Sequence, residues 1–464
     1  MHPSVKGWKN GWKSFGEVLL PLQEDFPQVI ALMRYLVGMV STDHRRGQAS
    51  SIVGEELKEW ISGETAQRRS EQTNGVLFIP ILSENYCLGS CLKIAEEINK
   101  ADSKIPIYLA KPAGKAAELP SYVELVDFAF LRKKSWSKLL RAFFMSITYW
   151  RAVCRVLSRE KILCAEMARV YGNWKMHLFR WILLYHYDER IAAKFLTQKS
   201  IASVVTINDV VKPAAPVVSA GNKQGIRSVV LQHGTPGPQS APFLANQGWV
   251  WGETSRQALV TFGADPDRLK IIGNLEGEFL RSKGIRKTNE PRVLLFLAQW
   301  RATRGWGEPF FQEVFNLLRE VLVKCPGRWK LRVRLHPTDP AEAKSDIAAR
   351  LDHPTVSVEF ATKGVSMSNE LSEVDALLSV NSSGLMNGVS ANLPTAQILP
   401  RALEQVVGPA LLNAENLLRN GKELEQWFSR IESDDSLILS STSKVLANRG
   451  KVATLMAGEL ITFL

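Results

Sequence analysis

The chain has 464 residues, 45% of them hydrophobic, and a net charge of +12, which excludes a disordered or fibrous protein and leaves room for two domains of ordinary size. Its five cysteines are odd in number and scattered, so they indicate a reducing compartment rather than a disulfide framework or a zinc site. No run reaches the roughly 18 uncharged apolar residues of a membrane span, and the first residues lack the apolar core of a signal peptide. We therefore expect a cytoplasmic protein.

Residues 1–73 are predicted to form a helical, charged extension without chemistry of its own. Within it, Trp8, Trp12 and Phe15 follow one another at i, i+4 and i+7 among lysines, so they would share one face of a helix. Such a face favours contact with a membrane surface.

The first α/β domain is predicted over residues 74–281. Residues 76–82, VLFIPIL, form a continuous apolar run that is typical of a strand buried on both faces, and a helix follows it. Glu84 would lie in the loop between them, over the edge of the sheet, either as a catalytic acid or as a turn or capping residue. The next strands are predicted at residues 107–109 and 123–128.

A basic helical insertion is predicted at about residues 132–200. Between Arg132 and Lys161 there are nine Lys or Arg residues against one acid, interleaved with five aromatic residues. Three interpretations compete: a solvated helix pair packed on the core, a nucleic-acid surface, or a face that lies on anionic lipid. Aromatic residues beside long cationic side chains suit a lipid headgroup region. A DNA-binding motif is absent, and we expect no nucleic-acid partner.

The strands after the insertion end in residues that could carry chemistry. The strand at 201–207 ends in Asn208 and Asp209, and the strand at 228–231 ends in Gln232 and His233. A short strand at 249–251, a helix at 254–262 and a strand at 269–272 complete an α/β unit. Side chains at the carboxyl ends of parallel strands lie over the crevice where ligands usually bind. Asp209 and His233 are therefore candidate catalytic residues.

A polar segment at residues 282–291 predicts a linker, after which a second α/β domain spans 292–440 and a last helix 441–464. The strands predicted in the second domain span 292–297, 330–335, 355–360, 376–380 and 395–399. Its helices are predicted at 309–324, at 369–374, from 385 onward and at 414–430. Alternation of strands and helices again indicates a parallel sheet.

Polar side chains follow three strands of this second domain, and all should point toward the first domain. Serine hydroxyls and helix amides both donate hydrogen bonds to phosphate, and a histidine can donate to a leaving phosphate. The alternatives are a serine that caps a helix and a histidine that belongs to a turn. The candidate phosphate-binding or nucleotide-binding residues are Gln299, Arg301, Arg334, His336, Ser382 and Ser383.

These motifs together, LQHG, WGE, GADPDRLKIIGN, RLHPTD and VNSSG, resemble those of the two-domain GT-B glycosyltransferases. More narrowly, they resemble bacterial capsule and surface-polysaccharide transferases of the Kdo and sialic acid type. The resemblance covers about residues 75–400 and implies two Rossmann-like domains that face a cleft. It also implies that His336, Ser382 and Ser383 bind the phosphate of a CMP-activated sugar. The acidic-acidic-glycine motif of the sialyltransferases does not follow a strand here, which leaves a Kdo-type or other donor open.

A glycosyl transfer needs a carboxylate near the anomeric carbon and stabilisation of the leaving phosphate on the opposite side. Asp209, with Glu84 second, is the predicted carboxylate. Because no DxD element stands at a strand end, we expect metal-independent catalysis with no cofactor beyond the nucleotide-sugar donor. The acceptor would be lipid-linked or a growing polysaccharide at the inner membrane face of a bacterium. The alternatives are a CDP-polyol phosphotransferase of teichoic-acid type, a UDP-sugar transferase or epimerase, and a non-catalytic scaffold.

Overall fold

The computed structural model describes most of the chain after residue 73. The described residues are 74–80, 85–111, 119–127, 136–161, 164–165, 167–168, 172–210, 213–237, 240–278, 280, 291–300, 308–336, 339–362, 364–401, 403–404, 410–433, 445–448 and 450–464, with the isolated positions 19, 22, 29, 32 and 33. The predicted N-terminal extension, apart from these five positions, and the predicted linker, apart from its last residue, lie outside the described residues.

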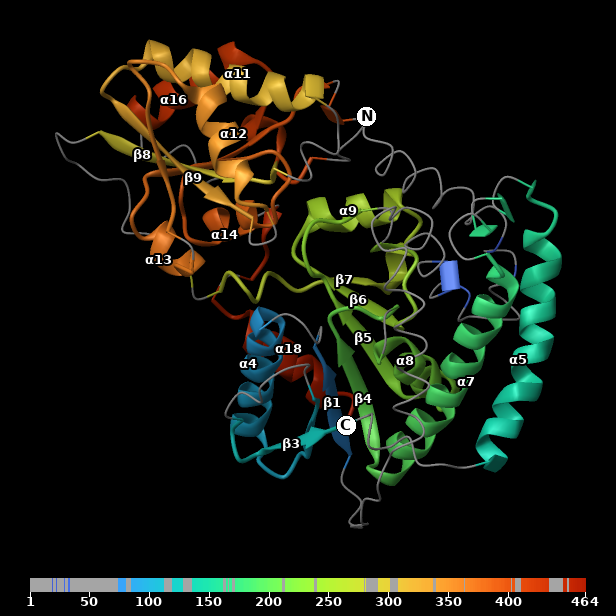
Figure 1. Ribbon diagram of the computed structural model, residues 1–464. Coiled ribbons are helices and arrows are strands. Elements are labelled where there is room, and N and C mark those ends of the chain that lie inside the picture. The colour runs from blue at the N-terminus through green and yellow to red at the C-terminus, as the bar shows by residue number, and fades with distance from the viewer. Residues whose placement is uncertain are drawn as a thin grey trace.

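The first domain is built on a parallel sheet of seven strands in the order β3-β2-β1-β4-β5-β6-β7 (Figure 1). The strands are β1 (Gly75–Ile79), β2 (Ile107–Ala110), β3 (Val123–Val126), β4 (Ile201–Thr206), β5 (Arg227–Leu231), β6 (Gln247–Val250) and β7 (Leu269–Ile271). The connecting helices include α4 (Asn85–Ala101), α8 (Ala214–Lys223) and α9 (Glu253–Thr261). The chain winds outward in both directions from the middle of the sheet, which is the doubly wound topology. The predicted α/β organisation of this half is confirmed.

The second domain holds a parallel sheet of six strands in the order β10-β9-β8-β11-β12-β13. The strands are β8 (Arg292–Ala298), β9 (Trp329–Leu335), β10 (Ser357–Phe360), β11 (Ala376–Ser379), β12 (Thr395–Ile398) and β13 (Leu417–Leu418). The helices include α11 (Glu308–Lys324), α12 (Glu342–Leu351), α13 (Met367–Leu371), α14 (Gly384–Ser390) and α16 (Gly421–Ser433). Its strands begin within about two residues of their predicted positions.

Two helices of the second domain differ from the prediction. Helix α12 was not predicted, although Ala343, Ile347 and Leu351 recur at i, i+4 and i+8 and are buried. Helix α16 begins at Gly421 and not at residue 414, because β13 lies between. The Asn420 Oδ1 accepts the Glu423 N–H at 3.0 Å, which caps the helix at this later position.

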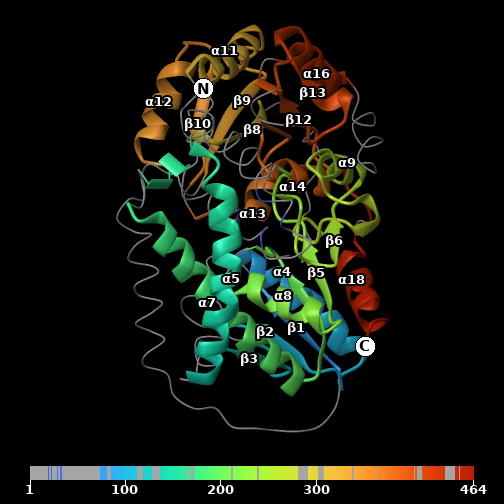
Figure 2. The same cartoon turned by 90° about the vertical axis from the view of Figure 1, so that its right-hand side faces the viewer.

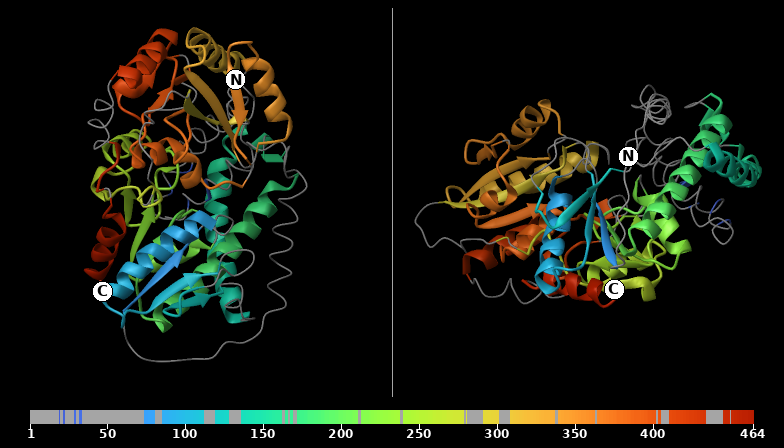
Figure 3. Two further views of the ribbon diagram at one scale, coloured as in Figure 1. Left: turned by 90° about the vertical axis from the view of Figure 1, so that its left-hand side faces the viewer. Right: turned by 90° about the horizontal axis from the view of Figure 1, so that it is seen from below.

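The chain returns to the first domain at its end. Helix α18 (Val452–Ile461) packs beside α4, as Figure 3 shows. Its Val452, Met456 and Leu460 are buried in one apolar cluster with Val76 and Phe78 of β1. The last helix therefore covers one face of the first sheet.

Two long helices lie between β3 and β4 in the sequence, where the insertion was predicted. They are α5 (Trp136–Leu157) and α7 (Trp174–Gln198). Helix α7 packs against both α5 and α8, and the Tyr185 hydroxyl donates to the Ala215 carbonyl of α8 at 3.1 Å. Helix α5 is thus the outermost layer on this side of the domain (Figures 1 and 2). No helix in the described part of the chain is long and apolar enough to cross a membrane.

A shared apolar cluster joins the two domains. Trp251 and Leu280 of the first domain pack in it with Val293, Leu385 and Leu411 of the second. Helices α13 and α14 lie on the side of the second domain that faces the first (Figure 2). The carboxyl ends of β5 and β6 and the start of α14 therefore belong to the same region of the molecule.

Candidate active site

Three strand ends of the second sheet stand side by side. Strand β8 pairs with β9 so that Ala298 lies opposite Leu335, and it pairs with β11 so that Leu297 lies opposite Ser379. Neighbouring strands are about 4.8 Å apart. His336, Gln299 and Ser382 therefore follow the three strands at one edge of the sheet. The structure brings these three predicted residues together.

The loops after β8 and β9 are joined by a residue that we did not predict. The Asp339 Oδ2 accepts the backbone N–H of His336 at 3.0 Å and that of Trp300 at 3.2 Å. This carboxylate fixes the backbone of both loops, while the His336 side chain is exposed. The signal was present as an Asp three residues after the histidine, which is a common turn arrangement. Arg301 lies outside the described residues.

The serine pair stands at the start of α14. The Ser382 Oγ accepts the Gly384 N–H at 3.2 Å, so Ser382 shapes the turn. Ser383 occupies the capping position of α14, and its hydroxyl makes no capping hydrogen bond. Gly384 is required here by close packing, because a Cβ at this position would lie 2.4 Å from the Leu297 Cδ1.

Arg334 was predicted to bind phosphate, and its surroundings argue against that role. Its guanidinium lies 3.2 Å from the Glu370 Oε2 and donates to the Val365 carbonyl at 2.8 Å. Glu370 is buried, and Arg332 also contacts it. The charge of Arg334 is thus balanced within the protein, and the residue ties β9 to α13.

His233 is paired with an acid that we did not predict. Its Nδ1 lies 3.6 Å from the Glu276 Oε1, and about a quarter of each side chain is exposed, 24% and 26%. His233 follows β5, and Glu276 follows β7. A carboxylate beside Nδ1 favours the tautomer with the proton on Nδ1, so that Nε2 carries the lone pair. The Glu276 carboxylate thus lies on the Nδ1 side of the His233 ring and leaves the Nε2 side of the ring to other partners.

Gln232 and Asn274 hold the two loops that carry this pair. The Gln232 Oε1 accepts the Trp251 N–H at 2.9 Å, and its Nε2 donates to the Gly234 carbonyl at 3.1 Å. Gly234 has a φ of 75°, which favours glycine after the histidine. The Asn274 Oδ1 accepts the Glu276 N–H at 3.1 Å. Hydrogen bonds between these two side chains and the backbone fix the geometry of the loops, and the sequence alone does not reveal them.

Lys93 of α4 belongs to the same neighbourhood. Burial lowers the pKa of Lys93, and the charges of Glu278 and Glu276 oppose this change. The Lys93 ammonium group therefore lies near Glu276, on the first-domain side of the candidate site. Its sequence signal, a lysine in the middle of an amphipathic helix, is not specific.

Asp209 was predicted to be the catalytic carboxylate, and the structure argues for a structural role instead. The residue is 3% exposed, and its Oδ2 accepts the Ala245 N–H at 2.7 Å. Burial lowers the pKa of the Arg268 guanidinium, and the charge of Asp209 opposes this change. The same guanidinium donates to the Ala245 carbonyl. Asp209 therefore fixes the segment before β6. Glu84, the second predicted acid, lies outside the described residues.

The two domains meet at a small pocket. Pro236, Trp251 and Thr254 line it from the first domain. Met386 of α14 and Leu411 line it from the second domain. The loop that begins at His233 and the helix that begins after the serine pair therefore line the same pocket. No group of three or more His, Cys, Asp or Glu residues that could hold a metal ion occurs within the described ranges.

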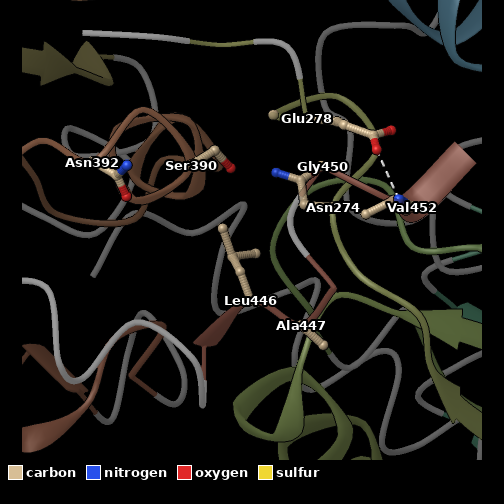
Figure 4. Close-up of a pocket in the computed structure, with 9 residues that line it drawn as sticks. Asn274, Glu278, Ser390, Asn392, Leu446, Ala447, Gly450 and Val452 are labelled. Carbon is tan, nitrogen blue, oxygen red and sulfur yellow. Dashed lines mark hydrogen bonds between the residues drawn. The ribbon is translucent and has the colours of Figure 1, made fainter.

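A second cavity of about 210 Å³ also lies between the domains (Figure 4). Ser390 and Asn392 line it from the second domain, opposite Asn274 and Glu278 of the first. It borders the point where the chain enters α18 at Val452. Since Asn274 also holds the Glu276 loop, this cavity adjoins the first-domain side of the candidate site.

Comparison with known proteins defines the fold. No protein-family model matches the sequence, and no curated relative matches it. The structure is similar to the apo form of the lipopolysaccharide outer core galactosyltransferase WaaB, with 12% identity over 84% of this chain and 100% of that chain and a TM-score of 0.50. A second similar structure is the UDP-GlcNAc 2-epimerase from Neisseria meningitidis bound to UDP-GlcNAc, with 10% identity over 84% of this chain and 100% of that chain and a TM-score of 0.49. A third is MurG from Acinetobacter baumannii, with 11% identity over the same shares of the two chains and a TM-score of 0.47.

At these identities the similarity shows the fold alone. The WaaB match and the two doubly wound sheets confirm the predicted GT-B fold of two Rossmann-like domains. A fold of this kind hosts more than one chemistry, so the activity must be argued from the site.

Proposed function

We propose that the chain is a transferase that moves a sugar from a nucleotide-activated donor to a hydroxyl group of a glycan acceptor. The observation that carries the proposal is the His233 and Glu276 pair on the first domain, whose following loop lines one pocket with α14, the helix after Ser382 and Ser383 on the second domain. A histidine held by a carboxylate suits the removal of a proton from a hydroxyl. Hydroxyl groups and an exposed imidazole suit a phosphate.

In the proposed reaction, the His233 Nε2 takes the proton of the acceptor hydroxyl as its oxygen attacks the anomeric carbon. The bond between that carbon and the phosphate oxygen of the donor breaks, and the nucleotide leaves with the electron pair. Glu276 stabilises the imidazolium that forms. The separation of 3.6 Å is long for a hydrogen bond, and such contacts often tighten only when substrate is bound.

On the second domain, His336, Gln299 and the serine pair are proposed to receive the leaving phosphate. Donors placed where negative charge develops lower the barrier more than donors that bind the ground state. Asp339 would act through the backbone of His336, since it holds the loop and not the ring. Arg334 is left out of this set because Glu370 already balances its charge.

The donor is proposed to be a CMP-activated ulosonic acid of Kdo type, and the acceptor a lipid-linked or growing surface polysaccharide. The support is the similarity of the RLHPTD and VNSSG segments to those of the Kdo and sialic acid transferases. We also propose that catalysis is independent of metal ions, because hydroxyl and imidazole donors can stabilise a single leaving phosphate.

The test is the thermal stability of the full chain with CMP, CDP and UDP at matched concentrations. A nucleotide that binds only the folded state raises Tm by mass action. We expect CMP to raise Tm, and both His336→Ala and the double variant Ser382→Ala/Ser383→Ala to lose the effect. His353→Ala is the matched control, because His353 precedes β10 at the opposite edge of the same sheet.

A rise with CDP alone would replace the donor by a CDP-polyol, as in teichoic-acid synthesis. A rise with UDP alone would indicate a UDP-sugar transferase or an epimerase. A chain that responds to none of the three nucleotides would contradict the proposal and favour the non-catalytic scaffold.

A further inference from the structure

Helix α5 carries four of the eight large apolar side chains that are exposed among the described residues. The exposed fractions are 57% for Leu140, 38% for Phe143, 62% for Phe144 and 40% for Met145. Leu140 and Phe144 are one turn apart on the outer side of α5, with Phe143 and Met145 on its two flanks, and we call these four residues the α5 apolar patch. Contiguous exposed apolar surface of this kind marks an interaction site more often than scattered apolar residues do.

Helix α5 has a packing face of its own, so the α5 apolar patch is an additional surface. Ala142, Ser146, Tyr149 and Val153 are buried on the inner side of the helix. Phe143 meets Phe179 of α7 edge to face, with 5.6 Å between ring centroids. Leu140 and Phe144 lie on the opposite side of α5 from these buried residues and face outward. Helix α5 is itself the outermost helix of the domain (Figures 1 and 2).

Cationic residues continue the patch along the helix. Arg151 and Arg155 follow Phe144 at i+7 and i+11, which places them on the same outer face, and both are exposed. Arg141 is exposed within the patch itself. Helix α5 contains no Asp or Glu in its sequence. The outer face is therefore apolar in its first half and positively charged in its second.

This charge pattern distinguishes among the partners. A symmetric antiparallel contact with a second copy of the chain would pair the apolar halves of two α5 helices but would leave the arginines at its two ends without an anionic partner. A nucleic acid would use the arginines but would leave Phe144 and Leu140 without an apolar partner. An anionic bilayer satisfies both halves, because apolar side chains enter the headgroup and acyl boundary while arginines approach lipid phosphates.

We infer that the outer face of α5 docks the protein on an anionic lipid surface, with Leu140 and Phe144 inserted and Arg141, Arg151 and Arg155 held by lipid headgroups. The inference goes beyond the proposed transfer reaction, since docking needs neither donor nor acceptor. It chooses the third of the interpretations that the sequence left open for the basic insertion.

The experiment is flotation of the full chain with vesicles of phosphatidylcholine alone and with vesicles containing about 30% phosphatidylglycerol. We expect binding to the anionic vesicles and weakening at high salt, because screening shortens the reach of surface charges. Phe144→Ser/Leu140→Ser should lower the partition coefficient at least ten-fold. Arg151→Ser/Arg155→Ser should lower it about 25-fold, since each arginine contributes roughly a factor of five near an anionic surface.

Matched controls come from other faces of the molecule. Val260→Ser and Leu455→Ser remove apolar side chains that are each 38% exposed on α9 and α18. Lys104→Ser/Lys422→Ser removes two exposed lysines outside α5. All of these variants should bind the vesicles as the parent chain does. Each variant is also checked for an unchanged Tm, so that loss of binding is not loss of folding.

Equal binding by the α5 variants and the controls would overturn the inference, and so would binding that ignores the phosphatidylglycerol content. A dimer in lipid-free solution that dissociates in Phe144→Ser/Leu140→Ser would also overturn it and assign the patch to self-association. The proposed function fails separately: a chain that binds the vesicles but responds to no nucleotide would retain the docking surface and lose the transferase.

Discussion

The Glu278 carboxylate accepts the backbone N–H of Val452 at 2.8 Å, and so connects the loop after β7 to the first turn of α18. It also accepts the Ala453 N–H at 3.1 Å. The capping position of α18 is Lys451, whose side chain makes no capping hydrogen bond. A negative charge supplied from elsewhere in the chain therefore satisfies the helix N-terminus. The last helix and the Glu276 loop are held by one residue.

Replacing Glu278 with Ala should weaken the attachment of α18. The free energy of unfolding should fall by about 1–2 kcal/mol, because two buried N–H groups lose their acceptor and the helix N-terminus loses a favourable charge. Urea unfolding measures this change. Glu96→Gln on the exposed face of α4 is the control, since its pair with Lys100 is solvated and its loss should change the free energy of unfolding little. Equal losses in the two variants would refute the capping role.

Glu189 should make the stability depend on acidic pH. Burial by itself would raise its pKa, but His186, Lys223 and Ser219 together lower it to about 2 from the ordinary 4.5. Its Oε1 lies 2.7 Å from the Lys223 Nζ. Because the folded pKa is the lower one, this stabilisation is complete above about pH 4.5 and is lost as the pH falls toward 2.

The variant Glu189→Gln should therefore unfold more easily at pH 7, by about 2–3 kcal/mol, and should lose less stability than the parent chain between pH 4.5 and 2. Unfolding curves in urea across this pH range measure both effects. Parallel pH profiles for the two proteins would show that Glu189 does not titrate with a lowered pKa. The ion pair of Glu189 with Lys223 joins α7 to α8. It therefore supports α5, which packs on α7 and carries the proposed docking surface.

Substitutions of His233 and Asp209 should have different effects, the first on catalysis and the second on stability. His233→Gln should reduce kcat by about 10²–10⁴-fold, the usual contribution of a general base, and should change the free energy of unfolding by less than about 0.5 kcal/mol. Asp209→Asn should lower that free energy by about 1–3 kcal/mol, because it weakens a buried charged hydrogen bond. Donor consumption and urea unfolding are measured on both variants.

Glu276→Gln tests the partner of His233. It should reduce kcat less than His233→Gln does, since the ring loses the carboxylate that orients it but keeps its basic nitrogen. An unchanged kcat would leave Glu276 without a catalytic part. A loss of activity in Asp209→Asn without a loss of stability would return Asp209 to the catalytic role that the sequence suggested.

The strand ends could be located from the sequence because their signals are local. An apolar run followed by His-Gly, His-Pro or Ser-Ser-Gly identifies the end of a buried strand, and parallel pairing then places such ends at one edge. This reasoning located His233, His336 and Ser382. The two sheets and the GT-B fold followed from the same alternation of strands and helices.

Partner identity could not be predicted, because it depends on contacts between distant loops. Asp209 and Glu276 both follow strands, and nothing in their local sequence tells which one faces a backbone amide and which one faces His233. Arg334 likewise carries its charge next to the predicted phosphate site, yet Glu370 of α13 balances it. Sequence distance hides such pairings until the chain is folded.

Gly384 and Gly89 provide a matched test of the packing behind the serine pair. Both glycines lie in helices, α14 and α4. A Cβ at Gly384 would lie 2.4 Å from the Cδ1 of the buried Leu297, whereas a Cβ at Gly89 would meet nothing within 4 Å. Gly384→Ala should lower the free energy of unfolding by about 1–3 kcal/mol, since the Leu297 side chain of β8 must repack.

Gly89→Ala should instead raise that free energy by about 0.5–1 kcal/mol, because alanine restricts the unfolded chain more than glycine does and favours the helix. Urea unfolding of the two variants gives the sign directly. The two variants should change the free energy of unfolding in opposite directions only if the turn after β11 packs tightly against Leu297. A stabilised Gly384→Ala chain would mean that the turn after β11 is looser, and that the positions of Ser382 and Ser383 are not fixed by packing.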